Sequence, residues 1–129
     1  MFDWKKPTVQ MLGRWQPWHD GHQALFKRCF AKTGQVIIQV RDVQGASGGD
    51  KQDDNPFDWD TVCKNIEDGL IRDGFKRGFE YEIMLVPNIV NITYGRGVGY
   101  SFDEEVFESA ITNISATKIR KKMRDEGKL

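Results

Sequence analysis

The chain has 129 residues, enough for one compact domain. Its 19 Lys and Arg residues balance 19 Asp and Glu residues, so net charge favours neither nucleic acid nor a membrane as a partner. No apolar run approaches the length of a membrane span. Met1 to Pro7 contains no apolar signal core. We expect a cytoplasmic protein with one domain over residues 1–129, and homo-oligomerisation is left open.

The two cysteines, Cys29 and Cys63, form no C-x-x-C pair and lie in helix-like sequence. We expect free thiols from this spacing, because neither a disulfide framework nor a metal site is indicated.

Helix and strand signals alternate along the chain. Short β-branched or apolar runs predict strands at Thr8–Leu12, Gln35–Val40, Tyr81–Val86 and Ile111–Ile114. Amphipathic stretches predict a helix capped by Asp20 and reaching Lys32, a second from Asn55-Pro56 to Asp73, and a third from Ser115 to about Glu126. Gly34 is placed to end the first helix.

Three segments have weaker signals. Arg41–Asp54 is polar and glycine-rich, and we interpret it as a mobile loop. Asn88–Gly99 is also loop-like, and Ser101–Phe107 fits no single class. The alternation of strands and helices predicts an α/β fold, a Rossmann-like doubly wound parallel sheet in a single compact domain. Such sheets bind ligands at the carboxyl ends of their strands.

The only histidines, His19 and His22, lie three apart where the first strand turns into the first helix. Gly13 and Gly21 in this turn permit close approach of backbone to a ligand. Backbone N–H groups at a helix start bind anions, and Arg14 with the two imidazoles would add donors. The turn therefore predicts a phosphate site. Surface histidines, a weakly supported zinc site, or a Trp15–Trp18 pair that serves only the core are the alternatives.

The segment Gly13–His22 reads G-R-W-Q-P-W-H-D-G-H. It resembles the H-x-G-H signature of the nucleotidylyltransferase superfamily, and its G-R-x-Q-P-x-H-x-G-H form is most similar to archaeal-type nicotinamide-nucleotide adenylyltransferases. Cytidylyltransferases more often carry G-T-F-D before the first His, and sulfate adenylyltransferases use a looser H-x-x-H.

A second motif, Ile114–Arg120, reads I-S-A-T-K-I-R. Ser115 is placed to cap a helix whose free N–H groups, at Ala116 and Thr117, would point out of the first turn. Arg120, one turn further, could reach the same point with a bidentate fork. The alternative is a capped, basic surface helix. The motif resembles the I-S-S-T-x-I-R signature of the same superfamily, and Asn55-Pro56-Phe57 is similar to a helix start in the archaeal-type enzymes.

The resemblance implies an enzyme that transfers AMP from ATP to a phosphorylated small molecule such as nicotinamide mononucleotide and releases pyrophosphate. It implies catalysis by His19, His22 and Arg120. It implies nucleotide binding by Gly13, Arg14, Trp15, His19, Gly21, His22, Ser115, Ala116, Thr117 and Arg120. Mg²⁺ would enter with the ATP phosphates, without a metal site built from protein side chains.

The acceptor phosphate would already be ionised, so positioning and charge stabilisation would supply the catalysis. Acceptor-binding candidates lie on the predicted strand-end loops: Asp42, Asn88, Asn91, Tyr94 and Arg96. Competing hypotheses are a cytidylyltransferase for an alcohol phosphate such as glycerol 3-phosphate, an adenylyltransferase for another anion such as sulfate, and a nucleotide-binding regulator without turnover. An aminoacyl-tRNA synthetase fragment is disfavoured, because no K-M-S-K-S motif follows.

Overall fold

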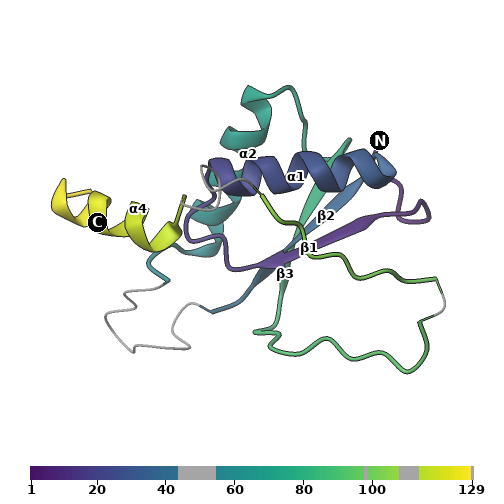
Figure 1. Ribbon diagram of the computed structural model, residues 1–129. Helices are drawn as coiled ribbons and strands as arrows, with labels where there is room; N and C mark the ends of the chain where they lie inside the picture. The colour runs from purple at the N-terminus through teal and green to yellow at the C-terminus, as the bar shows by residue number, and fades with distance from the viewer. Residues whose placement is uncertain (44–54, 98, 108–113, 129) are drawn as a thin grey trace.

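The computed structural model describes residues 1–43, 55–97, 99–107 and 114–128. Its elements follow in the order β1 (Val9–Gly13), α1 (Asp20–Thr33), β2 (Val36–Arg41), α2 (Trp59–Arg72), β3 (Tyr81–Val86) and α4 (Ala116–Asp125), as Figure 1 shows. The expected α/β class is confirmed. Within the described ranges, no helix is both long and apolar enough to cross a membrane.

The three strands form one parallel sheet in the order β1-β2-β3. Met11, Ile38 and Ile83 lie side by side in this register, and all three are buried. Burial alternates along β2, where Val36, Ile38 and Val40 are buried while the residues between them are half-buried. One face of the sheet therefore faces the core, as the period of two in a strand requires.

Helices α1 and α2 both belong to that core and also contact each other. The Gln23 side chain donates to the Gly69 carbonyl at 2.6 Å. A Cβ at position 69 would lie 2.9 Å from the Trp18 ring and 3.2 Å from the Gln23 side chain, so glycine at this position lets α2 pack closely against Trp18 and α1. Right-handed crossovers between successive neighbouring strands place both helices on the same face. The described residues thus form one wound layer on a sheet, and double winding stays a prediction.

Two helix starts differ from the sequence prediction. Helix α1 is capped by His19, not Asp20. Helix α2 begins at Trp59, where the Asp58 carboxylate accepts from the Thr61 N–H. Asn55 is therefore not a cap, and it is buried instead. The third cap, Ser115, and the left-handed Gly34 that ends α1 are confirmed.

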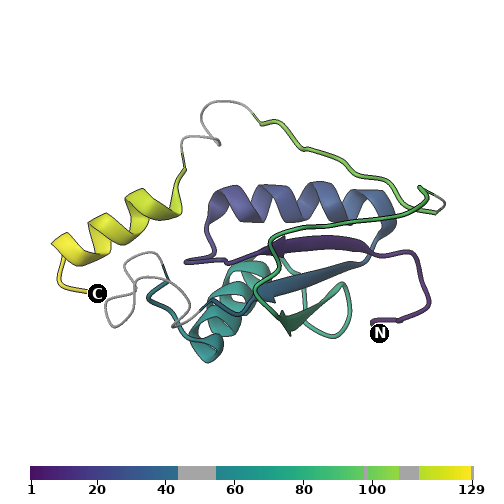
Figure 2. The ribbon, with the colours of Figure 1, turned by 90° about the horizontal axis from the view of Figure 1, so that it is seen from below.

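The chain after β3 runs back toward the amino ends of the strands and returns beside α1 (Figures 1 and 2). Lys32 pairs with Asp103 and Glu105, and Arg28 donates to the Val106 carbonyl. The described residues between 87 and 107 contain no helix or strand. Residues 108–113, which hold most of the predicted strand Ile111–Ile114, lie outside the described residues, as do residues 44–54 of the predicted loop.

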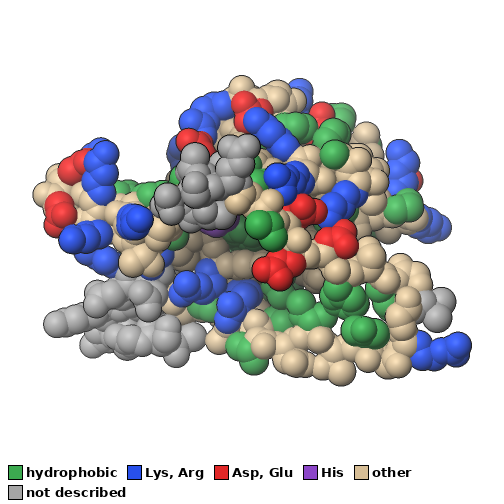
Figure 3. Space-filling model, viewed as in Figure 1, with side chains coloured by type: hydrophobic (Ala, Val, Ile, Leu, Met, Phe, Trp, Pro, Cys, Tyr) green, Lys and Arg blue, Asp and Glu red, His purple; other side chains and the backbone are tan. Residues whose placement is uncertain are grey.

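This segment exposes many large apolar side chains, namely Val90, Ile92, Tyr94, Tyr100, Phe102 and Val106. Hydrophobic side chains are visible along the part of it that lies at the lower right in Figure 3. The segment is therefore held to the domain mainly by charged and polar contacts at α1, and its apolar side chains are not part of the core.

Candidate functional site

The turn between β1 and α1 is shaped by two buried tryptophans. Trp15 has a positive φ of 54°, and its indole N–H donates to the Gln39 carbonyl at 3.0 Å. A Cβ at Gly13 would lie 2.8 Å from the Trp15 ring, so glycine is needed there for packing. Trp15 and Trp18 pack on each other with ring centroids 5.2 Å apart. Their side chains serve the core, which leaves only the Trp15 backbone to contact a nucleotide.

His19 and His22 cap helix α1 reciprocally. His19 Nδ1 accepts from the Gly21 N–H at 3.0 Å, and His22 Nδ1 accepts from the His19 N–H at 3.2 Å. The two rings stack with centroids 3.6 Å apart. Because each Nδ1 is an acceptor, each neutral ring must carry its proton on Nε2. The turn therefore holds two Nε2–H donors in adjacent, fixed rings.

Burial keeps both imidazoles uncharged at neutral pH. Desolvation, together with a smaller contribution from the neighbouring His19, lowers the pKa of His22 to about 3. The His22 ring packs edge-on against Trp15, with centroids 4.7 Å apart. Desolvation also lowers the pKa of His19, although the Asp20 carboxylate opposes this shift. The rings are thus neutral hydrogen-bond donors and not imidazolium cations.

Hydrogen bonds fasten the turn to the segment that leads into α2. The Gln16 carboxamide both donates to the Phe57 carbonyl and accepts from the Phe57 N–H, each at 2.9 Å. Arg14 donates to the Asn55 carboxamide oxygen at 3.1 Å. Asn55-Pro56-Phe57 was interpreted from the sequence as a helix start. In the structure, this segment instead holds the turn in place through hydrogen bonds to Arg14 and Gln16. Sequence reasoning missed Gln16 and Asn55, because their partners lie 41 residues away.

The second motif meets the first through Arg120. Its guanidinium donates to the Gln16 carbonyl at 2.5 Å, across 104 residues of sequence, and to the Thr117 hydroxyl at 3.3 Å. Arg120 is only 2% exposed, so in this conformation it joins α4 to the turn. The Ser115 hydroxyl accepts weakly from the Lys118 N–H at 3.4 Å. The first turn of α4 is half-buried at Ala116 and exposed at Thr117.

The acceptor candidates divide into two groups. The Asp42 N–H donates to the Val86 carbonyl, and Asn88 accepts from Arg41, so both candidates lie where β2 and β3 end. The others are exposed on the segment after β3: Asn91, Tyr94 and Arg96. The contacts known for the described residues join none of these three to the histidine turn. Their role in acceptor binding stays a prediction.

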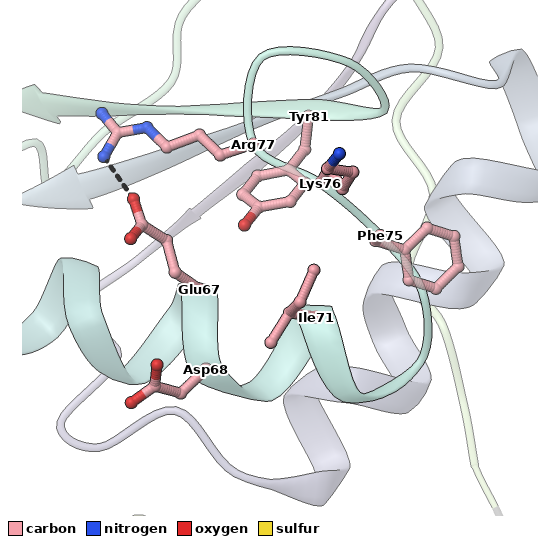
Figure 4. A pocket seen from close by; sticks show the side chains of 7 residues that line it. All are labelled: Glu67, Asp68, Ile71, Phe75, Lys76, Arg77 and Tyr81. Atoms are coloured by element: carbon pink, nitrogen blue, oxygen red, sulfur yellow. Dashed lines mark hydrogen bonds and ion pairs between the residues drawn. The ribbon is translucent and has the colours of Figure 1, made fainter.

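A hollow of about 360 Å³ lies at the other end of the sheet, between α2 and the start of β3 (Figure 4). Arg77 bridges Glu67 and Glu82 across its rim, so its cation is already neutralised. Burial raises the pKa of Tyr81, which also lines the hollow. Parallel sheets place ligands at the carboxyl ends of strands, and this hollow is at an amino end. None of the residues that line this hollow belongs to either of the two motifs.

No family model matches the chain, and no curated protein matches it either. Function is therefore inferred from the residues, their geometry and the motif resemblance. Within the described ranges, no group of three or more His, Cys, Asp or Glu residues could hold a metal ion.

Proposed function

We propose that this protein is a nucleotidyltransferase that moves AMP from ATP onto a phosphorylated small molecule and releases pyrophosphate. One observation carries the proposal: the hydrogen bond between Arg120 and the Gln16 carbonyl brings the two signature motifs together. A capped surface helix and an unrelated histidine pair would have no reason to meet. A doubly wound Rossmann-like sheet is the fold that this function would use.

The histidine turn supports the chemistry. In the proposed reaction, an oxygen of the acceptor phosphate forms a bond to the α-phosphorus, and the bond from that phosphorus to the bridging oxygen of pyrophosphate breaks. Negative charge grows on the leaving group and on the α-phosphate oxygens. Neutral Nε2–H donors fixed by capping bonds would stabilise this charge without reorganising. No proton needs to be removed from the ionised acceptor.

In the proposed reaction, Mg²⁺ would bind together with ATP, as a complex with the triphosphate. The donors at the turn are imidazole and guanidinium groups, which bind phosphate oxygens and not Mg²⁺. The triphosphate and water would therefore hold the ion, as Mg²⁺ commonly requires. It would neutralise phosphate charge, while Arg14 and the start of α4 would orient the nucleotide.

The test is pyrophosphate release in the presence of Mg²⁺. ATP and CTP are each paired with nicotinamide mononucleotide, glycerol 3-phosphate and sulfate, and pyrophosphate is measured enzymatically. We expect ATP to support turnover with a phosphorylated acceptor, and loss of that turnover in His19→Asn. Preference for CTP with glycerol 3-phosphate would establish the cytidylyltransferase alternative. Nucleotide binding without pyrophosphate release from any pair would indicate a regulator and refute the enzyme.

A further inference from the structure

Arg41 is a basic residue at the ligand-binding edge of the sheet that sequence reasoning did not select. It is the last residue of β2 and lies opposite Val86, the last residue of β3. The strand pair stays joined beyond this point, because the Asp42 N–H donates to the Val86 carbonyl at 2.8 Å. A cation is thus fixed at the carboxyl ends of two adjacent parallel strands, where such sheets bind ligands.

The Arg41 guanidinium is only partly satisfied. One terminal nitrogen donates to the Asn88 carboxamide oxygen at 2.7 Å. Its Nε is buried and has no hydrogen-bond partner among the described residues. The same residues provide no carboxylate within ion-pair distance of it. A buried charged donor without an acceptor is rare in native proteins and often marks the place of an ion or ligand.

A small hollow adjoins this guanidinium. It has a volume of about 40 Å³, and its lining includes Gln16, Arg41, Phe57 and Trp59. This is room for one small group and not for a nucleotide. Gln16 also lines the histidine turn, and its carbonyl accepts from Arg120. The hollow therefore borders the first motif at Gln16 and lies next to the proposed nucleotide site.

The start of α2 borders the same hollow through Asp58 and Trp59. The positive end of a helix dipole favours an anion there. The Asp58 carboxylate opposes an anion less than a free carboxylate would, because it accepts from the Thr61 N–H. Asp42 also lines the hollow, and it is exposed to solvent, which screens the charge of its carboxylate. The Arg41 cation, the start of α2 and a hollow that fits one small group together indicate a site for a tetrahedral oxyanion.

We propose that Arg41 binds the phosphate group of the acceptor, through its Nε–H and a terminal N–H, with Asn88 holding the guanidinium in place. The inference rests on the proposed function and names the acceptor class, a phosphate monoester. The planar fork of arginine matches two phosphate oxygens, which lysine cannot do. Arg41 would then fix the acceptor while the histidine turn acts on ATP.

A direct test is titration of inorganic phosphate into the isotope-labelled protein, followed by the NMR signal of the Arg41 Nε–H. The signal is assigned by its loss in Arg41→Lys. We expect a saturable shift of this signal, with the same titration repeated in saturating α,β-methylene ATP to fill the nucleotide site. Arg28→Gln, on the outer side of α1, is the matched control and should titrate as the wild type does. A signal that does not move with phosphate would overturn the proposal.

Kinetics give the second test, on the acceptor that supports turnover. Arg41→Gln should raise the acceptor KM at least about 10-fold, with a much smaller change in kcat and in the ATP KM. Arg41→Lys should recover only part of this loss. If turnover exists and the acceptor KM of both variants is unchanged, the assignment of Arg41 is wrong and the proposed function stands. If phosphate shifts the Arg41 signal but no pair releases pyrophosphate, the anion site stands and the proposed function is wrong.

Discussion

Helices α1 and α4 both begin at a signature motif, yet their first turns are satisfied differently. At α1, two half-buried imidazoles accept backbone N–H groups and keep their other nitrogens as donors. At α4, a serine hydroxyl accepts one N–H at 3.4 Å, and the motif's cation is buried against the turn. The α1 start is a set of donors fixed by capping bonds, whereas α4 has one long capping bond and joins the turn through the buried Arg120.

The largest expected effect comes from removing an α1 donor while preserving the cap. Asparagine is among the best N-cap residues, so His19→Asn should keep the helix start while it removes the imidazole with its Nε2–H and its stacking on His22. We expect kcat to fall about 10²–10³-fold, or roughly 3–4 kcal/mol, with little change in ATP affinity. Steady-state kinetics and a thermal melt separate the two effects.

His19→Ala is the companion variant. It should show the same loss of turnover and, in addition, a stability loss of about 1 kcal/mol from the missing cap. A well-folded His19→Asn with near wild-type turnover would mean that the His19 imidazole at α1 is only a cap, and the difference between the two helix starts would lose its functional meaning.

Arg120→Ala tests the opposite arrangement at α4. Removing a buried, charged donor to the Gln16 carbonyl should cost up to about 3 kcal/mol of unfolding free energy. If Arg120 also reaches the β- and γ-phosphates when ATP binds, ATP affinity should weaken more than kcat. Lys121→Ala, exposed on the same helix, should change stability by only about 0.5 kcal/mol or less. Chemical denaturation measures the stability, and equilibrium binding measures the ATP affinity. Unchanged stability in Arg120→Ala would contradict the role of Arg120 in joining α4 to the turn.

The neutral state of the α1 imidazoles has a consequence for pH. The folded protein holds the pKa of His22 at about 3, whereas an unfolded chain has a value near 6.5. Below pH 6.5 the unfolded chain binds more protons, so stability is complete above pH 6.5 and falls as pH decreases toward 3. Between pH 7 and pH 5 the loss should be about 2 kcal/mol.

His22→Gln is the control for this pH effect, because a glutamine can make the same reciprocal capping bond without titrating. Denaturation at pH 7 and pH 5 should show a smaller pH-dependent loss in the variant than in the wild type. Equal losses in both proteins would show that His22 is not the titrating group.

Local signals were enough to predict strands β1, β2 and β3, the α/β class and two of the helix-end residues, Gly34 and Ser115. They failed where a side chain meets a distant partner. Asp20 was the expected cap from residue preferences, but the imidazole of His19 does the capping. The bond from Gln16 to Phe57 and the unsatisfied Arg41 depend on how β2 and α2 approach the turn. The segment after β3 has no periodic pattern, so its return along α1 could not be predicted.

The smallest effect is expected at the α4 cap. Because the Ser115 bond is long and the helix is largely exposed, Ser115→Ala should cost only about 0.5 kcal/mol, at the low end for a cap. Amide exchange in the first turn of α4 should speed up while the rest of the chain is unchanged. Larger, protein-wide destabilisation would mean that α4 is capped as rigidly as α1.

Ser115→Asp then asks whether the open α4 start faces the triphosphate. A carboxylate at this position is an equally good cap and interacts favourably with the helix dipole, by about 0.3–1 kcal/mol. Stability should therefore hold or rise slightly. The same negative charge would repel the β- and γ-phosphates if ATP is oriented as proposed. Two like charges a few ångströms apart in a partly dry site repel by at least about 1.4 kcal/mol, so ATP affinity should fall about 10-fold or more. A variant that is more stable and binds ATP unchanged would place the triphosphate away from α4 and leave the α1 turn as the nucleotide site by itself.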